Sequence, residues 1–346
     1  MELDLLVIGG GVIGLSCALH AADLAPRKRI AVLDRPTNAG VASRAAAGML
    51  APFAEFAADT PLFRMCLASL DYYPEFLARF APGVSLEGRG TLLPDDPAEP
   101  GRLESRAALA AAHGREARLI EGAALRALEP GLAPSVRRAL LLPERLVDPR
   151  QLHDALRQSA LALGVGLLDD TPVEARVEGD RVGELSTFAG ASITAREVLL
   201  ATGAWSAKAG ALFGIDIPMT PVKGQVMQFA AGAVPLAHTI HTHGVYLAPR
   251  GGTVIAGATM EEAGFDPSLS TRANRDMAAA AAALWPPLAE LDLLDAWTGF
   301  RPRTADGQPV IARSGVLANL SVATGHFRNG ILLAPLTGRL AARLLS

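Results

Sequence analysis

The sequence predicts an α/β fold with two domains whose segments alternate along the chain. The 346 residues, half of them hydrophobic, are enough for about two cores of ordinary size. The first 34 residues have the order strand, glycine-rich turn, helix, strand, which is typical of a parallel sheet. Between residues 222 and 256, short runs alternate apolar and polar residues and indicate an antiparallel sheet.

The composition excludes several classes of protein. Charged residues make up 19% of the chain and the net charge is −3, so neither nucleic acid nor an anionic membrane is indicated as a partner. Cys17 and Cys66 are too few for a disulfide scaffold. No apolar run approaches the roughly 18 residues of a membrane span, and Glu2 and Asp4 stand where an export signal would have Lys or Arg. We therefore expect a cytoplasmic protein without a membrane span.

The first strand, Leu3–Ile8, is wholly apolar and ends in a G-x-G-x-x-G turn that opens the helix Leu15–Leu24. Gly9 permits the tight turn, Gly11 lets a pyrophosphate approach the backbone, and Gly14 lets the helix lie close to the strand. The free N–H groups and dipole at the helix start favour phosphate. This segment therefore predicts a dinucleotide site.

The second strand, Ile30–Leu33, ends in Asp34, about 20 residues after the last glycine of the turn. An acid at this position accepts hydrogen bonds from a ribose hydroxyl, which favours FAD or NAD over NADP. Residues 37–54 then contain no clear strand, and Gly40, Ser43 and Gly48 indicate a loop packed against a ligand. A nicotinamide dehydrogenase would continue with regular strand–helix units, so this loop favours a flavoprotein.

The remaining elements are predicted from apolar periodicity and from turn residues. We expect a helix over 61–80, a strand pair or bent strand over 84–93, a broken helical pattern over 95–134, a helix from 148 to 163, strands at 165–168, 173–177, 182–187 and 197–201, a helix over 271–284, and a strand, turn and helix within 319–346.

Several separated motifs resemble the D-amino-acid-oxidase-like family of FAD enzymes and, within it, the bacterial glycine oxidases of the thiamine pathway. The motifs are GGGVIG at 9–14, LDR at 33–35, SRAAAGMLAP at 43–52, PVKGQ at 221–225, GFRP at 299–302 and GHFRNGILLAP at 325–335. The resemblance implies a Rossmann-type FAD-binding domain of residues 1–82, 145–217 and 300–346. It also implies an interleaved substrate-binding domain of residues 83–144 and 218–299 on a mixed, largely antiparallel sheet.

The resemblance also assigns cofactor contacts residue by residue. FAD would be held by the glycine turn, the acid and its neighbour, the loop after them, an adenine-binding strand, the turn after a later strand, and the C-terminal motif. These residues are Gly9, Gly11, Val12, Ile13, Gly14, Asp34, Arg35, Ala42, Ser43, Ala47, Gly48, Met49, Val173, Gly203, His326, Phe327, Arg328, Asn329, Gly330, Ile331 and Leu332. Residues 40–52 and 302–315 contain no Cys or His, where covalently flavinylated relatives have one, so we expect noncovalent FAD.

When a flavin oxidises an amino acid, a hydride leaves the substrate Cα and the site must hold the substrate carboxylate in position. A strong side-chain base is not obligatory. The planar fork of Arg301 matches a carboxylate, and the resemblance assigns it, Tyr246 and Arg328 to the substrate pocket, with Met49 and Met260 as apolar walls. His241 and His243 have no further ligands at metal spacing, so we expect no metal and place both near solvent or the pocket entrance.

The resemblance therefore implies oxidative deamination of glycine, and of small amines such as sarcosine or small D-amino acids. O2 would be reduced to H2O2, and the imine would supply thiazole synthesis. Alternatives are a D-amino-acid dehydrogenase or sarcosine-type oxidase on the same scaffold, and a non-catalytic flavin-binding subunit, against which Arg301 and Tyr246 argue. The partners would be an amino-acid substrate, O2 and other copies of the chain, with the family suggesting a homotetramer. No role is assigned to Arg44.

Overall fold

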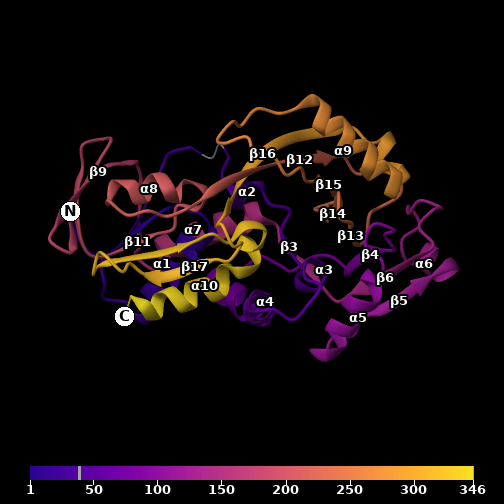
Figure 1. Ribbon diagram of the computed structural model, residues 1–346, viewed down its shortest axis with the longest axis horizontal. Helices are drawn as coiled ribbons and strands as arrows, with labels where there is room; N and C mark the ends of the chain where they lie inside the picture. Colours follow the sequence, from indigo (N-terminus) through magenta and orange to yellow (C-terminus); the bar gives the residue numbers. More distant parts are fainter. Residues whose placement is uncertain (38–39, 346) are drawn as a thin grey trace.

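The structure, a computed structural model, describes residues 1–37 and 40–345. It contains two large sheets near opposite ends of an elongated molecule, with both chain termini beside the first sheet (Figure 1). The first sheet has the order β17–β18–β11–β1–β2–β8, with β9 and β10 continuing from β11. Its strands are β1 (Glu2–Ile8), β2 (Ile30–Asp34), β8 (Gly166–Asp169), β9 (Pro172–Glu178), β10 (Arg181–Thr187), β11 (Ser192–Leu200), β17 (Val310–Arg313) and β18 (Leu320–Thr324).

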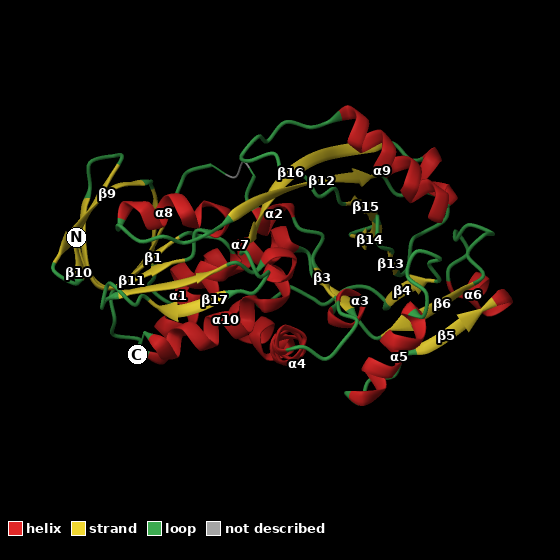
Figure 2. Cartoon of the chain, viewed as in Figure 1, coloured by secondary structure: helices red, strands yellow, loops and turns green. Residues whose placement is uncertain are grey.

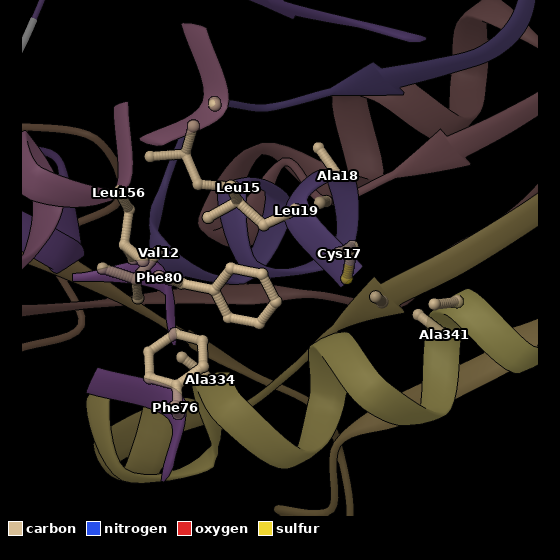
Figure 3. Close-up of a cluster of buried hydrophobic side chains, with 14 of the residues drawn as sticks. Val12, Leu15, Cys17, Ala18, Leu19, Phe76, Phe80, Leu156, Ala334 and Ala341 are labelled. Carbon is tan, nitrogen blue, oxygen red and sulfur yellow. The ribbon is translucent and has the colours of Figure 1, made fainter. Parts of the chain in front are cut away.

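Five adjacent strands of this sheet, from β18 to β8, are parallel, and β1 is buried on both of its faces. Leu5 and Val7 enter a core with four helices, whereas Leu6 and Ile8 enter a second core on the other face. The helices of the first core are α1 (Val12–Leu24), α4 (Pro61–Phe80), α7 (Pro149–Ala162) and α10 (Gly330–Leu344), which lie together in Figure 2. Figure 3 shows side chains of all four helices pointing toward one another.

Local sequence explains where two of these helices begin. Thr60 precedes Pro61, and its hydroxyl accepts a hydrogen bond from the Phe63 N–H (3.1 Å). Asp148 precedes Pro149 and accepts from the Arg150 and Gln151 N–H groups. An N-cap oxygen followed by proline both satisfies free donors and fixes the first backbone angle of the helix.

The second sheet has the order β16–β12–β15–β14–β13–β4–β6–β5 and is antiparallel except between β13 and β4. It is therefore mixed and largely antiparallel, as predicted. Helix α9 (Thr271–Leu284) packs on it, with the following Trp285 fully buried. The strands are β4 (Thr91–Pro94), β5 (Arg118–Glu121), β6 (Arg138–Leu142), β12 (Thr220–Phe229), β13 (Thr239–His241), β14 (Tyr246–Arg250), β15 (Thr253–Gly257) and β16 (Leu293–Arg303).

The other elements are short. They are α2 (Ala42–Ala45), β3 (Met49–Leu50), α3 (Pro52–Glu55), α5 (Arg102–Ala112), α6 (Gly122–Leu128), β7 (Arg145–Leu146), α8 (Ser206–Leu212) and the 3₁₀ turns η1 (Gly203–Trp205), η2 (Pro286–Glu290) and η3 (Phe327–Asn329). The predicted α/β fold is confirmed. The helical pattern predicted over 95–134 did not include strand β5, and the strand pair predicted over 84–93 is the single strand β4. Strands β6, β16 and β17 were not predicted. Their formation depends on pairing with other strands of the two sheets.

None of the helices in the described ranges is long and apolar enough to cross a lipid bilayer. Cys17 on α1 and Cys66 on α4 are both buried free thiols, and burial raises the pKa of each to about 12. Both therefore act as small apolar side chains of the first core.

Candidate active site

A single cleft collects residues from both sheets. It is bordered by the carboxyl ends of β1, β2, β11 and β18, by α2 and β3, by β12, β14 and β16, and by the start of α10. Its empty space is about 1770 Å³, including the open mouth. The cleft therefore joins the glycine turn after β1 to the strands of the second sheet in one continuous site.

The glycine turn forms one end of the cleft. Gly9 has φ +111°, and a Cβ there would lie 2.4 Å from the Ala201 carbonyl oxygen. A Cβ on Gly14 would lie 1.8 Å from the Gly9 oxygen, so Gly14 serves close packing and does not line the cleft. Gly11 begins α1 without a capping side chain of its own, and the Val12 N–H donates to the Ser43 hydroxyl (3.0 Å). The helix start therefore fits a phosphate.

Asp34 ends β2 in the same cleft. Burial raises the pKa of its carboxyl, partly offset by a hydrogen bond from the Gly10 backbone. A poorly hydrated carboxylate gains from further hydroxyl donors, such as those of a ribose. Next to it, the Arg35 guanidinium lies 3.6 Å from the centre of the Trp205 ring, and both side chains border this end.

The segment 45–49 is held by the second sheet. Arg250 of β14 donates to the carbonyls of Ala46 (2.9 Å) and Ala47 (2.7 Å), and the Trp297 indole donates to that of Ala45 (3.0 Å). Ala45, Ala46 and Ala47 border the cleft. Because three of its backbone carbonyls are fixed, this segment is a rigid wall on which a flat ring system fits.

The start of α10 forms the facing wall. Gly330 and Ile331 border the cleft, preceded by Phe327 with the unusual φ of 45°. His326 is buried, and its Nε2 lies 2.9 Å from the Thr337 hydroxyl. Desolvation lowers the pKa of His326 to about 3, so the ring is neutral. The free N–H groups of the helix thus supply the positive potential here, and the residues present fit the isoalloxazine of FAD.

Arg301 and Tyr246 lie together farther along the cleft. The Arg301 Nη1 donates to the Thr259 carbonyl (2.9 Å). Two glycines make room for these side chains: a Cβ on Gly224 would lie 2.3 Å from Arg301 Nη2, and one on Gly257 would lie 2.3 Å from the Tyr246 hydroxyl. Burial raises the pKa of Tyr246, with the nearby Arg301 acting in the opposite direction, so the phenol stays protonated as a donor.

The other cations of the cleft have partners. Arg328 pairs with Glu55 at the end of α3 (2.8 Å). Among the described residues, by contrast, no ion pair joins Arg301 to a carboxylate, although burial lowers its pKa. A half-buried guanidinium whose charge has no carboxylate partner favours an anionic ligand. Arg301 thus lines the cleft as a guanidinium without a carboxylate partner among the described residues.

His241 and His243 both border the cleft, but in different surroundings. His243 is exposed, whereas His241 is buried with its Nδ1 3.2 Å from the Arg102 guanidinium. Desolvation, followed by Arg102, lowers the pKa of His241 to about 3. The sequence predicted that both histidines face solvent or the pocket entrance. His241 does not face solvent, because it is buried beside the α5 arginine, but it does line the cleft. Within 1–37 and 40–345, no group of three His, Cys, Asp or Glu side chains is arranged to hold a metal.

The structure shows partners for Arg44 that the sequence did not suggest. It pairs with Asp154 (2.5 Å) and lies 3.3 Å from His153 Nδ1. The His153 Nε2 reaches the Gly10 carbonyl (2.8 Å), and burial lowers the pKa of the imidazole. Helix α7 thus supports the glycine turn from behind. Neither His153, Glu55 nor Arg250 was predicted, because each acts across a large sequence separation and none lies in a recognisable motif.

Of the residues predicted to contact FAD, all but three border the cleft. The exceptions are Gly14, Val173 and Leu332. Val173 on β9 is 48% exposed and Leu332 is buried in the first core. Met49 and Met260 both border the cleft, Met260 with 60% of its surface exposed.

Glu144 supports α3 from the interior and gives a testable pH dependence. Its Oε1 accepts from the Phe53 and Ala54 N–H groups (2.7 and 3.0 Å), and burial raises its pKa from 4.5 to about 7. Because the Glu144 carboxyl has a higher pKa in the folded state than in the unfolded state, the free energy of unfolding falls as pH rises from 4.5 to 7. Across this pH range, we expect the free energy of unfolding of wild type to fall by up to about 3 kcal/mol relative to that of Glu144→Gln. Urea unfolding at several pH values measures this.

The control for this prediction is Glu116→Gln, at a side chain that is 82% exposed. It should follow the wild-type profile. If the free energy of unfolding changes with pH in the same way in wild type and in Glu144→Gln, the pH dependence does not come from this carboxyl.

Residues 4–344 match the protein family described as FAD dependent oxidoreductase. The bifunctional protein ThiO/ThiG of Synechocystis sp. is 35% identical, over 99% of this chain and 51% of its own length. The glycine oxidase of Geobacillus kaustophilus is 33% identical, over 99% of this chain and 92% of its own. The chain thus spans about half the length of the bifunctional relatives and nearly all of the glycine oxidase.

The architecture has solved counterparts. The crystal structure of glycine oxidase from Geobacillus kaustophilus superposes with a TM-score of 0.91 at 31% identity, covering 99% of this chain and 94% of that one. An iminodiacetate oxidase from Chelativorans sp. BNC1 has a TM-score of 0.88 at 27% identity, with 98% and 94% covered.

Proposed function

This chain belongs to the FAD-dependent oxidoreductase family, and we propose that it is an oxidase that deaminates glycine. Glycine, O2 and water would give glyoxylate, ammonia and H2O2. The observation that carries the proposal is the unmatched guanidinium of Arg301, which lies beside the Tyr246 phenol in the cleft. Similarity to ThiO/ThiG proteins supports supply of the glycine imine to thiazole synthesis.

The cofactor is FAD. When bound, it accepts a hydride from the substrate Cα. We propose that the glycine turn and Ser43 hold its diphosphate and that Asp34 holds the ribose. Ala47, Gly48 and Met49 would lie against the isoalloxazine, with residues 326–332 closing on its other edge. The β9 backbone at Val173 would hold the adenine.

The chain's own residues would bind and orient glycine. Arg301 would take the carboxylate through its planar fork while Tyr246 donates a second hydrogen bond to it. A carboxylate fixed at two points directs Cα and the amine toward the wall formed by residues 45–49. Glu55 is engaged with Arg328, so this scheme requires no free carboxylate as a base, only a neutral amine.

The test is a substrate panel measured with and without O2. Glycine, sarcosine and D-alanine would be compared for bleaching of the yellow flavin under nitrogen and for peroxide release in air. Peroxide formation with glycine supports the oxidase. Bleaching without peroxide in air would favour a D-amino-acid dehydrogenase, and a flavin that none of the substrates reduces would favour a non-catalytic subunit.

We expect the FAD to be noncovalent. The wall formed by residues 45–49 presents alanines, a glycine and a methionine, and no nucleophilic side chain that links to flavin. Precipitation with acid should therefore release all of the flavin into the supernatant. Yellow colour or flavin fluorescence that remains on the denatured chain after washing would contradict this expectation.

We further propose a homotetramer in the cytoplasm, where Cys17 and Cys66 would remain the free thiols found here. Light scattering on the purified holoenzyme tests the assembly. We also propose that the first sheet and its helices, from residues 1–82, 145–217 and 300–346, form the FAD domain. Residues 83–144 and 218–299 would then form the substrate domain.

A further inference from the structure

Helix α10 contains an irregularity one turn after the point where it borders the cleft. Pro335 lies inside the helix and has no N–H, so the Ile331 carbonyl lacks the hydrogen bond that a regular helix would supply. Ile331 itself borders the cleft. A carbonyl left unpaired in the core would cost free energy, so another donor must satisfy it.

Two buried hydroxyls of α4 donate hydrogen bonds to the backbone carbonyls of this turn. The Tyr73 phenol donates to the Ile331 carbonyl (3.0 Å), and the Ser69 hydroxyl donates to the Leu332 carbonyl (2.6 Å). Ser69 Oγ also accepts from the Leu336 N–H (3.3 Å). It thus joins a carbonyl and an amide that pair directly with each other in a regular helix.

These hydroxyls do not belong to the cleft. Ser69 and Tyr73 have no exposed surface and do not border it. Figure 3 shows Phe76 of the same helix beside Ala334 of α10, so α4 packs directly across the first turn of α10. A phenol and a hydroxyl in an apolar core would be costly unless the carbonyls they bind needed donors.

We propose that Ser69 and Tyr73 are positioning residues that hold the first turn of α10 against the flavin. The proposal rests on the FAD placement under Proposed function, but not on glycine as the substrate. The free N–H groups of a helix start favour negative charge. Their stabilisation of reduced flavin depends on how near this turn lies, and the two α4 hydroxyls set that position.

The test measures FAD itself, without substrate. Apoprotein of Tyr73→Phe and of Ser69→Ala would be titrated with FAD, and the midpoint potential of each holoprotein measured against a reference dye. We expect FAD binding about 5- to 30-fold weaker and a more negative potential. A tenfold preferential loss of affinity for reduced FAD corresponds to about 30 mV for a two-electron couple.

Two further variants separate positioning from loss of stability. Tyr72→Phe removes a hydroxyl of the same helix that lies 3.0 Å from His20 Nε2 and makes no hydrogen bond to the first turn of α10. The ring, which packs under Arg339 near the far end of α10, is kept, so FAD affinity and potential should match wild type. Pro335→Ala restores an N–H that can bond to the Ile331 carbonyl. In combination with Tyr73→Phe, it should recover most of the lost FAD affinity.

The proposal is overturned if Tyr73→Phe and Ser69→Ala match Tyr72→Phe in both FAD affinity and potential, even where their melting temperatures fall. It is also overturned if Pro335→Ala does not rescue Tyr73→Phe. Absence of glycine turnover in wild type would overturn the proposed substrate and leave these flavin measurements intact.

Discussion

Gly11→Val should produce a folded, colourless protein with no glycine oxidation. Gly11 has φ −69° and ψ 175°, which any residue adopts, so the substitution does not strain the backbone. A Cβ there would lie 2.9 Å from the Ser43 hydroxyl, the far end of a side chain that can rotate away. The added methyl groups would instead occupy the space at the start of α1 that a diphosphate needs.

The measurements are flavin content per chain, from the visible spectrum, and thermal unfolding of apoprotein. We expect flavin occupancy below about a tenth of wild type, since two displaced phosphate hydrogen bonds weaken binding by roughly 100-fold or more. Gly315→Val is the matched control, because Gly315 has open space around its Cβ position and no positive φ. Full occupancy in Gly11→Val would place the diphosphate elsewhere.

The sequence predicted the first sheet well because its signals are local. The apolar run of β1, the glycine turn, α1 and β2 follow one another within 34 residues, and each is specified by neighbouring side chains. Asp34 could be assigned because chain connectivity alone places the end of β2 beside the end of β1.

The second sheet was harder because its strands are specified by distant partners. Strand β16 pairs with β12 along its length, which places Arg301 opposite Val222 and beside Gly224. Nothing in the sequence around Gly224 indicates that it leaves space for a guanidinium about 77 residues away. The resemblance identified Arg301, but only the sheet register explains why its neighbour is glycine.

Charge partners were the least predictable part of the site. The resemblance assigned Arg328 to the substrate pocket but gave no partner for its charge, because its ion pair with Glu55 depends on where the four-residue α3 lies. Similarly, the pKa of His241 is lowered first by burial and then by Arg102, which lies on another element, α5. Ion pairs and desolvation depend on packing in three dimensions, which neither residue spacing nor periodicity records.

Arg301→Ala should lower kcat/KM for glycine by about 30- to 1000-fold. A bidentate, charge-assisted pair in a partly dry cleft contributes roughly 2–4 kcal/mol. Glycine has no side chain to share the binding energy, so the loss should be large for it. Arg301→Lys keeps the charge without the planar fork and should fall between wild type and Arg301→Ala. Flavin content should stay near wild type in both variants, because the FAD contacts are assigned to other residues.

Two further variants make this prediction specific to the guanidinium's position. Arg303→Ala removes a cation two residues away that pairs with Glu262 at the surface, and it should change kcat/KM less than threefold. Gly224→Ala keeps Arg301 but introduces a Cβ where the guanidinium now lies, so it should raise KM for glycine while leaving flavin content unchanged. If Arg301→Ala retains full flavin and its kcat/KM for glycine falls less than about threefold, the substrate carboxylate is bound elsewhere. Arg328 would then be the next candidate, because its pairing with Glu55 leaves it 35% exposed beside the same cleft.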